Sequence, residues 1–311
     1  MRRAAIIALA AAGVVAAALV LIAAYVLSPA GRGALATFAE TRIERVVGGE
    51  VEIGSLTGNL TQRVELNDVR FLTEGTEWAS VSQATMDWSP GALFSRRVEI
   101  GAIEIEDASI IARPPSRERK EPFKGLELPE SLPVLSIDRI ALRNVKVAGE
   151  LSREPLRLDG EGSVAMGGAA LSISARVKEA RGRDTIDIDI VRKSAVEAPT
   201  LKINISSAPD GAVTALTGSE GAVSFVAEGS GPLQGYRIAF RAEAGVYGSM
   251  SGELAGDIAA LDAIDFTLAA APGARFSRFV ADLGNEVTAS GVLALQERGA
   301  RLTLQKISGA F

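Results

Sequence analysis

The chain has 311 residues, with 33 basic and 38 acidic side chains, no histidine and no cysteine. Without those two residue types, Ser-His-Asp and Cys-His catalysis, the usual zinc sites and disulfides are all excluded. The mildly acidic balance and the lack of a basic patch argue against a nucleic-acid partner, and the length suggests about two domains.

The first segment, residues 4–27, is apolar and uncharged. A helix of that length would be about 36 Å long, enough to cross a hydrocarbon core of about 30 Å. Secretory signals have apolar stretches of only about 7–15 residues, so we predict an uncleaved transmembrane anchor over residues 1–30, although residues 28–30 are small, as at a cleavage site. Arg2 and Arg3 predict a cytoplasmic N-terminus, with the body of the chain across the membrane.

Residues 31–49 carry apolar side chains near helical spacing, with charged residues between them. Gly48 and Gly49 end this pattern, since glycine tolerates the left-handed conformation of a helix C-terminus. The pattern predicts a juxtamembrane amphipathic helix. Such a helix fits either the bilayer interface or the first strand of the fold, and a narrow apolar stripe does not separate the two.

From Glu50 onward apolar residues alternate with polar ones, which predicts strands with one wet face and an all-β, antiparallel body. A first β unit is expected over residues 50–112. It contains VELNDVRF (64–71) and IEIEDASI (103–110), and the same pattern returns in IALRNVKV (140–147). In each, the alternation shifts by one at an Asn or Asp. A β-bulge there would return the apolar residues to one face, in a curved apolar wall or in an ordinary sandwich or barrel.

Residues 113–133 are rich in proline and charge. Proline cannot donate to a sheet ladder, so this segment is expected to be a linker. A second β unit follows over residues 134–311, with clear alternation in DTIDIDI (184–190) and YRIAF (236–240).

No catalytic pattern stands out. Asp187 and Asp189 share a strand face and have the chemistry for Ca²⁺ or acid–base work, but a solvated outer face explains them more simply. GSGPLQG (229–235) lacks the dinucleotide-binding spacing and is expected to be a turn. We therefore expect a protein that is not an enzyme, with no catalytic residue, no metal site and no cofactor. A carboxylate hydrolase is disfavoured by the missing histidine.

Four short segments, taken in their order along the chain, resemble the N-terminal portion of the AsmA-like family, in its translocation and assembly module (TamB-type) branch. They are SLTG (55–58), LNDV (66–69), DWSP (87–90) and RPP (113–115). The resemblance covers roughly residues 1–149. It implies an elongated, curved β structure, a taco-like groove or a β-solenoid-like fold, behind an N-terminal transmembrane helix. Family members are usually much longer and end in a further β domain, so the second β unit is expected to continue beyond this chain.

The resemblance further implies a single-pass protein of the cell inner membrane with its body in the periplasm. Its partners would be phospholipid, the inner membrane and an outer-membrane Omp85-class (TamA-like) protein. Its function would be to carry phospholipid along the groove between the two membranes and to support outer-membrane protein or autotransporter assembly. The alternative is an assembly scaffold that binds the Omp85-class partner by strand addition without carrying lipid. The apolar strand positions are the groove candidates: Leu66, Phe71, Ile103, Ile105, Ile140, Leu142, Ile186, Ile188 and Ile190.

Overall fold

The computed structural model describes residues 50–59, 62–112, 132–147, 155–194, 197–217, 219–257, 263–276, 286–296 and 299–310. The predicted anchor at 1–30, the predicted helix at 31–49 and nearly all of the predicted linker at 113–133 lie outside these ranges. Within them, no helix has the length and apolar character that a membrane span requires.

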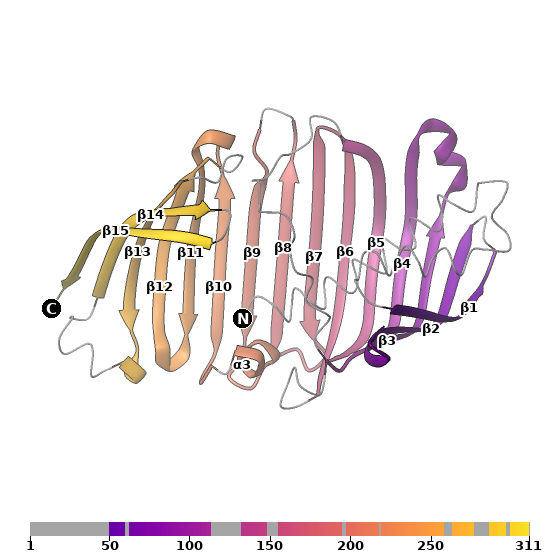
Figure 1. The fold of residues 1–311 in the computed structure, drawn as a ribbon, viewed down its shortest axis with the longest axis horizontal. Coiled ribbons are helices and arrows are strands. Elements are labelled where there is room, and N and C mark those ends of the chain that lie inside the picture. Colours follow the sequence, from indigo (N-terminus) through magenta and orange to yellow (C-terminus); the bar gives the residue numbers. More distant parts are fainter. Residues whose placement is uncertain are drawn as a thin grey trace. The chain divides into compact units, whose positions relative to one another are not determined.

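Strands make up most of the described chain, as the alternating pattern predicts (Figure 1). The first seven are β1 (Glu50–Thr57), β2 (Arg63–Thr73), β3 (Thr76–Trp88), β4 (Arg97–Ile110), β5 (Leu132–Val147), β6 (Leu156–Gly168) and β7 (Ala170–Glu179). The remaining eight are β8 (Asp184–Arg192), β9 (Thr200–Ser207), β10 (Val223–Ser230), β11 (Tyr236–Ala244), β12 (Gly248–Gly256), β13 (Ile264–Pro272), β14 (Glu286–Gln296) and β15 (Gly299–Ala310). Between strands lie the helix α3 (Ala212–Thr217) and the 3₁₀ turns η1 (Pro90–Ser95), η3 (Leu233–Gly235), η4 (Gly245–Tyr247) and η5 (Ala274–Phe276).

The chain forms two compact units, which divide within β6 and β7. Unit 1 holds β1 to β5, most of β6 and the end of β7. Unit 2 holds the start of β7 and all of β8 to β15. The division lies later in the chain than the predicted boundary at 113–133.

Strands that follow one another in the sequence are neighbours in the sheet, in the order β1 to β15. Hairpin partners such as β2 and β3 pair antiparallel, as predicted. The pair β4 and β5 corrects that prediction, because it is parallel, with Arg97 opposite Val134 and Ile110 opposite Val147. A parallel pair needs a crossover of about a dozen residues or more, and residues 111–131 supply that length. The proline-rich segment therefore joins two neighbouring strands of unit 1.

Each of the three repeated patterns carries one residue with a left-handed backbone. These residues are Asp68 in β2 (φ 55°), Asp107 in β4 (φ 53°) and Asn144 in β5 (φ 54°). Asn and Asp tolerate this conformation because their short polar side chains bond locally. Asn144 donates from Nδ2 to the Asp107 carboxylate, so neighbouring left-handed residues are tied together.

The register corrects the predicted β-bulge at this position. In β2 and β3, Asn67 pairs with Gln83 and Val69 with Val81, so one residue of each strand lies between the two pairs. A bulge would set two residues against one. The left-handed residue therefore changes which alternate positions face the core without adding a residue to the strand.

The predicted consequence of the shift is nevertheless confirmed by burial. In β2, Val64 and Leu66 before Asp68 are buried, and so are Val69 and Phe71 after it. Without the shift, one of these pairs would face water, because alternate residues of a strand point to opposite faces.

In unit 1 the apolar side chains of the strands are buried in one cluster. Leu66, Phe71, Ile103 and Ile105 are each no more than 2% exposed and belong to one cluster of side chains drawn from β1 to β5. The rings of Phe71 and Trp78 pack with centroids 5.4 Å apart. Burying one such side chain contributes about 1.5–3 kcal/mol, so this cluster is a conventional hydrophobic core.

Unit 2 has a buried polar network where β8 begins. The Asp184 carboxylate accepts hydrogen bonds from the Ser207 hydroxyl (2.8 Å) and from the backbone N–H of Val213 (2.6 Å) in α3. The Thr214 hydroxyl donates to the carbonyl of Gly211 at 2.7 Å. The network fixes α3 against the ends of β8 and β9, since a buried carboxylate is stable only when its oxygens are bonded.

Candidate apolar binding face

The isoleucines of β8 face apolar partners on β9. The register pairs are Ile186 with Ile205, Ile188 with Ile203 and Ile190 with Leu201. Opposite residues of an antiparallel pair share a face, with Cβ atoms about 4.5–5.5 Å apart. The six side chains therefore form one apolar patch, and Asp187 and Asp189 lie on the other face.

The registers of β9 to β15 extend this patch across unit 2. One row runs Ile188, Ile203, Ala227, Phe240, Gly252, Leu268, Ala289 and Ile307. A second row runs Ile190, Leu201, Gly229, Ile238, Leu254, Phe266, Gly291 and Leu304. A third row runs Ile186, Ile205, Phe225, Ala242, Met250, Ala270 and Val287. We call these three rows the apolar face of unit 2.

Most large side chains of this face are only half-buried. Ile188, Ile203, Phe240 and Leu268 all keep part of their surface exposed. On β15 the exposure is larger, and 59% of Ile307 is accessible. An apolar area that stays accessible over eight strands is unlike a folded core and is typical of an interaction or ligand-binding surface.

Aromatic rings lie over glycines of neighbouring strands on this face. A Cβ atom at Gly252 would come 3.0 Å from the Phe240 ring, and one at Gly291 would come 2.9 Å from the Phe266 ring. The rings of Phe225 and Phe240 are nearly parallel, 26° apart in tilt and 6.4 Å apart in position. Rings that cover glycine in this way shield the backbone from water.

Tyr236 borders the same face. Its ring crowds the position that a Cβ of Gly229 would take, and its hydroxyl donates to the carbonyl of Pro199 at 2.6 Å. Burial raises the pKa of the Tyr236 phenol above the usual 10.0, because the charged form loses its hydration.

The opposite face of unit 2 is polar. Asp189 lies opposite Lys202 in the register of β8 and β9. Arg237 of β11 and Glu253 of β12 form an exposed ion pair at 3.2 Å. Exposed pairs of this kind contribute about 0–1 kcal/mol, so their main effect is to keep this face in water.

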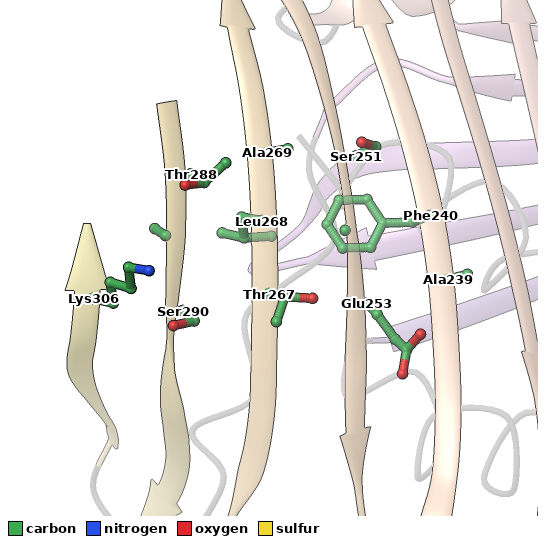
Figure 2. Close-up of a pocket in the computed structure, with 12 residues that line it drawn as sticks. Ala239, Phe240, Ser251, Glu253, Thr267, Leu268, Ala269, Thr288, Ser290 and Lys306 are labelled. Carbon is green, nitrogen blue, oxygen red and sulfur yellow. The ribbon is translucent and has the colours of Figure 1, made fainter. Parts of the chain in front are cut away.

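An open hollow of about 510 Å³ lies over β11 to β15 (Figure 2). Its volume is within the roughly 300–1,000 Å³ of small-molecule sites. Phe240 and Leu268 supply its largest apolar side chains, and Glu253 and Lys306 bring one charge of each sign. The other lining residues are small: Ala239, Ser251, Gly252, Thr267, Ala269, Thr288, Ala289 and Ser290.

The nine sequence-predicted groove residues divide between the two units. In unit 1, Leu66, Phe71, Ile103 and Ile105 are core residues, so the expectation that they line an accessible groove is not met. They pack against one another instead of against a guest. Ile140 and Leu142 are half-buried against the same core. In unit 2, Ile186, Ile188 and Ile190 are half-buried and lie side by side on the apolar face.

Sequence reasoning missed most of the apolar face. Ile203 and Phe240 lie in segments whose alternation predicts strands, so the local signal was present. What alternation does not give is the register, which aligns Phe240 with Gly252 and Leu268 across three strands.

In the part of the chain that the structure describes, no cluster of three or more acidic side chains is arranged to hold a metal ion. No protein-family model, curated protein or solved structure matches this chain.

Proposed function

We propose that this chain is an inner-membrane-anchored periplasmic protein of the translocation and assembly module, TamB-type, and that the apolar face of unit 2 carries phospholipid acyl chains. In this role it serves traffic between the inner and outer membranes and supports the assembly or secretion of outer-membrane proteins. The observation that carries the proposal is the half-exposed apolar face, aligned strand by strand from β8 to β15.

The energetics favour a hydrocarbon guest. Moving an acyl chain of about 16 carbons into water costs roughly 12 kcal/mol, at about 0.8 kcal/mol per methylene. A continuous apolar surface removes much of that barrier, while the polar face of the same strands stays hydrated. Transport of this kind breaks no covalent bond and needs no catalytic residue.

The proposal assigns guest contact to unit 2 and packing to unit 1. Ile186, Ile188 and Ile190 keep their role as groove residues, joined by Ile203, Phe240 and Leu268. Ile103 and its neighbours stabilise the unit through their own contacts.

The test is photo-crosslinking from single positions in cells. A crosslinker at Ile188 or Leu268 is expected to capture phospholipid, identified by mass spectrometry. Matched crosslinkers at Asp189 and Asp265, on the other face of the same two strands, are expected to capture none. Equal capture from both faces, or capture from neither, would reject the conduit.

A second candidate, a scaffold that binds a β protein by strand addition, is favoured by β15. On this strand the apolar side chains of Leu302 and Ile307 are more than half exposed. Accessible apolar side chains of this kind mark surfaces that bind a partner protein. The same experiment separates the two functions, since a crosslinker at Leu302 that captures an outer-membrane barrel, with no lipid captured at Ile188, supports the scaffold.

A further inference from the structure

The turn η1 exposes an aromatic side chain almost completely. Phe94 is 93% accessible, whereas the next most exposed large apolar residue in the described chain, Ile307, is 59% accessible. Its neighbour Leu93 packs against the core of unit 1. The two adjacent residues thus point in opposite directions, one into the protein and one into solvent.

Hydrogen bonds hold this turn in place. The N–H of Ser89 donates to the Glu99 carbonyl at 2.9 Å, and that of Arg96 donates to the Leu93 carbonyl at 2.9 Å. Arg96 adopts a left-handed conformation, φ 55°, that ends the turn. A fixed turn with Leu93 packed against the core keeps Phe94 in solvent, so the exposure of Phe94 is a property of the fold.

The segment that contains the turn η1 is also basic. Residues 89–97, SPGALFSRR, contain two arginines and no acidic residue. Arg97 lies 3.8 Å from Glu99, a long and exposed contact, and Arg96 has no ion pair in the described structure. At the same end of unit 1, Arg63 is already paired with Glu65 and Asp87. Arg96 and Arg97 therefore remain available to an anionic partner.

We propose that the η1 tip, formed by Phe94, Arg96 and Arg97, docks on an anionic phospholipid surface. An aromatic ring inserts at the boundary between headgroups and acyl chains, and guanidinium groups bind phosphates in bidentate fashion. Each arginine near an anionic bilayer adds roughly a fivefold gain in partitioning. The charge of the tip complements such a surface, and this proposal does not depend on lipid transport by unit 2.

The chain itself favours a membrane over a protein partner. Residues 4–27 are expected to span the bilayer, and residues 28–49 join that segment to β1. Fully extended, this connection reaches at most about 75 Å. The tether would hold unit 1 close to a lipid surface at all times, which raises the local concentration of one class of partner, the phospholipid headgroups.

The test uses the whole 311-residue chain reconstituted into vesicles, with Phe94→Trp as a fluorescent probe. The vesicles contain phosphatidylcholine with or without phosphatidylglycerol, and their acyl chains are brominated to quench tryptophan. The native Trp78 and Trp88 are only 5% exposed, so the wild-type chain supplies a low background. The control is Ile111→Trp, at the opposite end of β4.

With phosphatidylglycerol present, the Phe94→Trp variant is expected to be quenched several-fold more than the Ile111→Trp control. Adding Arg96→Glu and Arg97→Glu to that variant is expected to remove most of the quenching. Quenching of the Phe94→Trp variant no greater than that of the control overturns the proposal, as does quenching that the charge reversal leaves unchanged. A probe signal that changes only when a protein extract is added would point to a protein partner and equally overturn it.

Discussion

Both units are built from strands in which apolar and polar residues alternate, but the apolar side chains are buried in unit 1 and partly accessible in unit 2. In unit 1 the apolar sides of β2 to β4 meet in a core in which Ile103 is fully buried. In unit 2 the register of β8 and β9 lines up Ile188 just as regularly, yet its side chain keeps part of its surface accessible. Alternation therefore specifies an apolar face but leaves open whether another part of the protein covers it.

Two local backbone features distinguish the two units. Unit 1 has left-handed residues such as Asp68 in mid-strand, which turn the apolar positions on either side toward one core. Unit 2 has glycines such as Gly252 and Gly291 in mid-strand, over which Phe240 and Phe266 lie. The first feature keeps the apolar residues on both sides of the left-handed position in the core. The second covers the backbone of a sheet whose apolar side stays accessible.

The largest expected difference comes from the same substitution in each unit. Ile103→Ala should cost about 2–5 kcal/mol, because it leaves a cavity in a packed core. Ile188→Ala should cost about 1 kcal/mol, since its site is already half open. Hydrogen exchange of the amides in β3 and β4, compared with those in β8 and β9, measures the two costs separately. Equal costs would show that the apolar face of unit 2 is as well packed as the core.

Substitution of the left-handed residue Asp68 should have a smaller effect on the stability of unit 1. Asp68→Val should destabilise unit 1 by about 1–2 kcal/mol, because a β-branched residue is strained at positive φ. Asp68→Gly should be close to neutral at the same position. Asp189→Val, in an extended and exposed part of β8, is the matched control and should change little. If Asp68→Val and Asp189→Val behave alike in thermal unfolding, the left-handed residue is not what shapes unit 1.

The smallest effect concerns Tyr236. Tyr236→Phe removes the hydrogen bond to the Pro199 carbonyl and should cost about 0.5–1.5 kcal/mol at neutral pH. The pKa of Tyr236 is raised in the folded state, so the unfolded chain loses this proton first. The contribution is therefore complete below pH 10 and falls as the pH rises through the folded-state pKa.

Denaturation profiles of the wild type and Tyr236→Phe, taken on both sides of pH 10, measure this difference. The gap in stability should narrow at alkaline pH. A gap that does not change with pH would mean that Tyr236 titrates alike in the folded and unfolded chains.

Particular residues show how far sequence reasoning reaches. Asp107 and Asn144 stand where the alternation shifts, and the shift identifies the positions at which the strands change their core-facing parity. The geometry there was predicted as a bulge, because a bulge and a left-handed residue leave the same mark on one-dimensional alternation. Only the register distinguishes a left-handed residue from a bulge. Around Asp68 one residue of each strand lies between the two flanking pairs, whereas a bulge would place two residues opposite one.

The parallel pair of β4 and β5 has a similar cause. Residues 113–133 are predicted to be a linker because proline and charge dominate them. Composition does not tell whether the strands on either side of such a segment separate or pair. The predicted groove residues differ in burial, and local pattern does not reveal that difference either. Ile103 and Ile188 have the same local pattern, so nothing local indicates that one is sealed and the other accessible.

By itself, the sequence determined that the body of this protein is β, which side of each strand is apolar and where that side shifts. These properties follow from side-chain periodicity and from the few residue types that tolerate a left-handed backbone. The tertiary structure decided which strands pair in parallel, which residues align across them and which apolar side is covered. Those outcomes depend on contacts between residues far apart in the chain, and no local pattern encodes them.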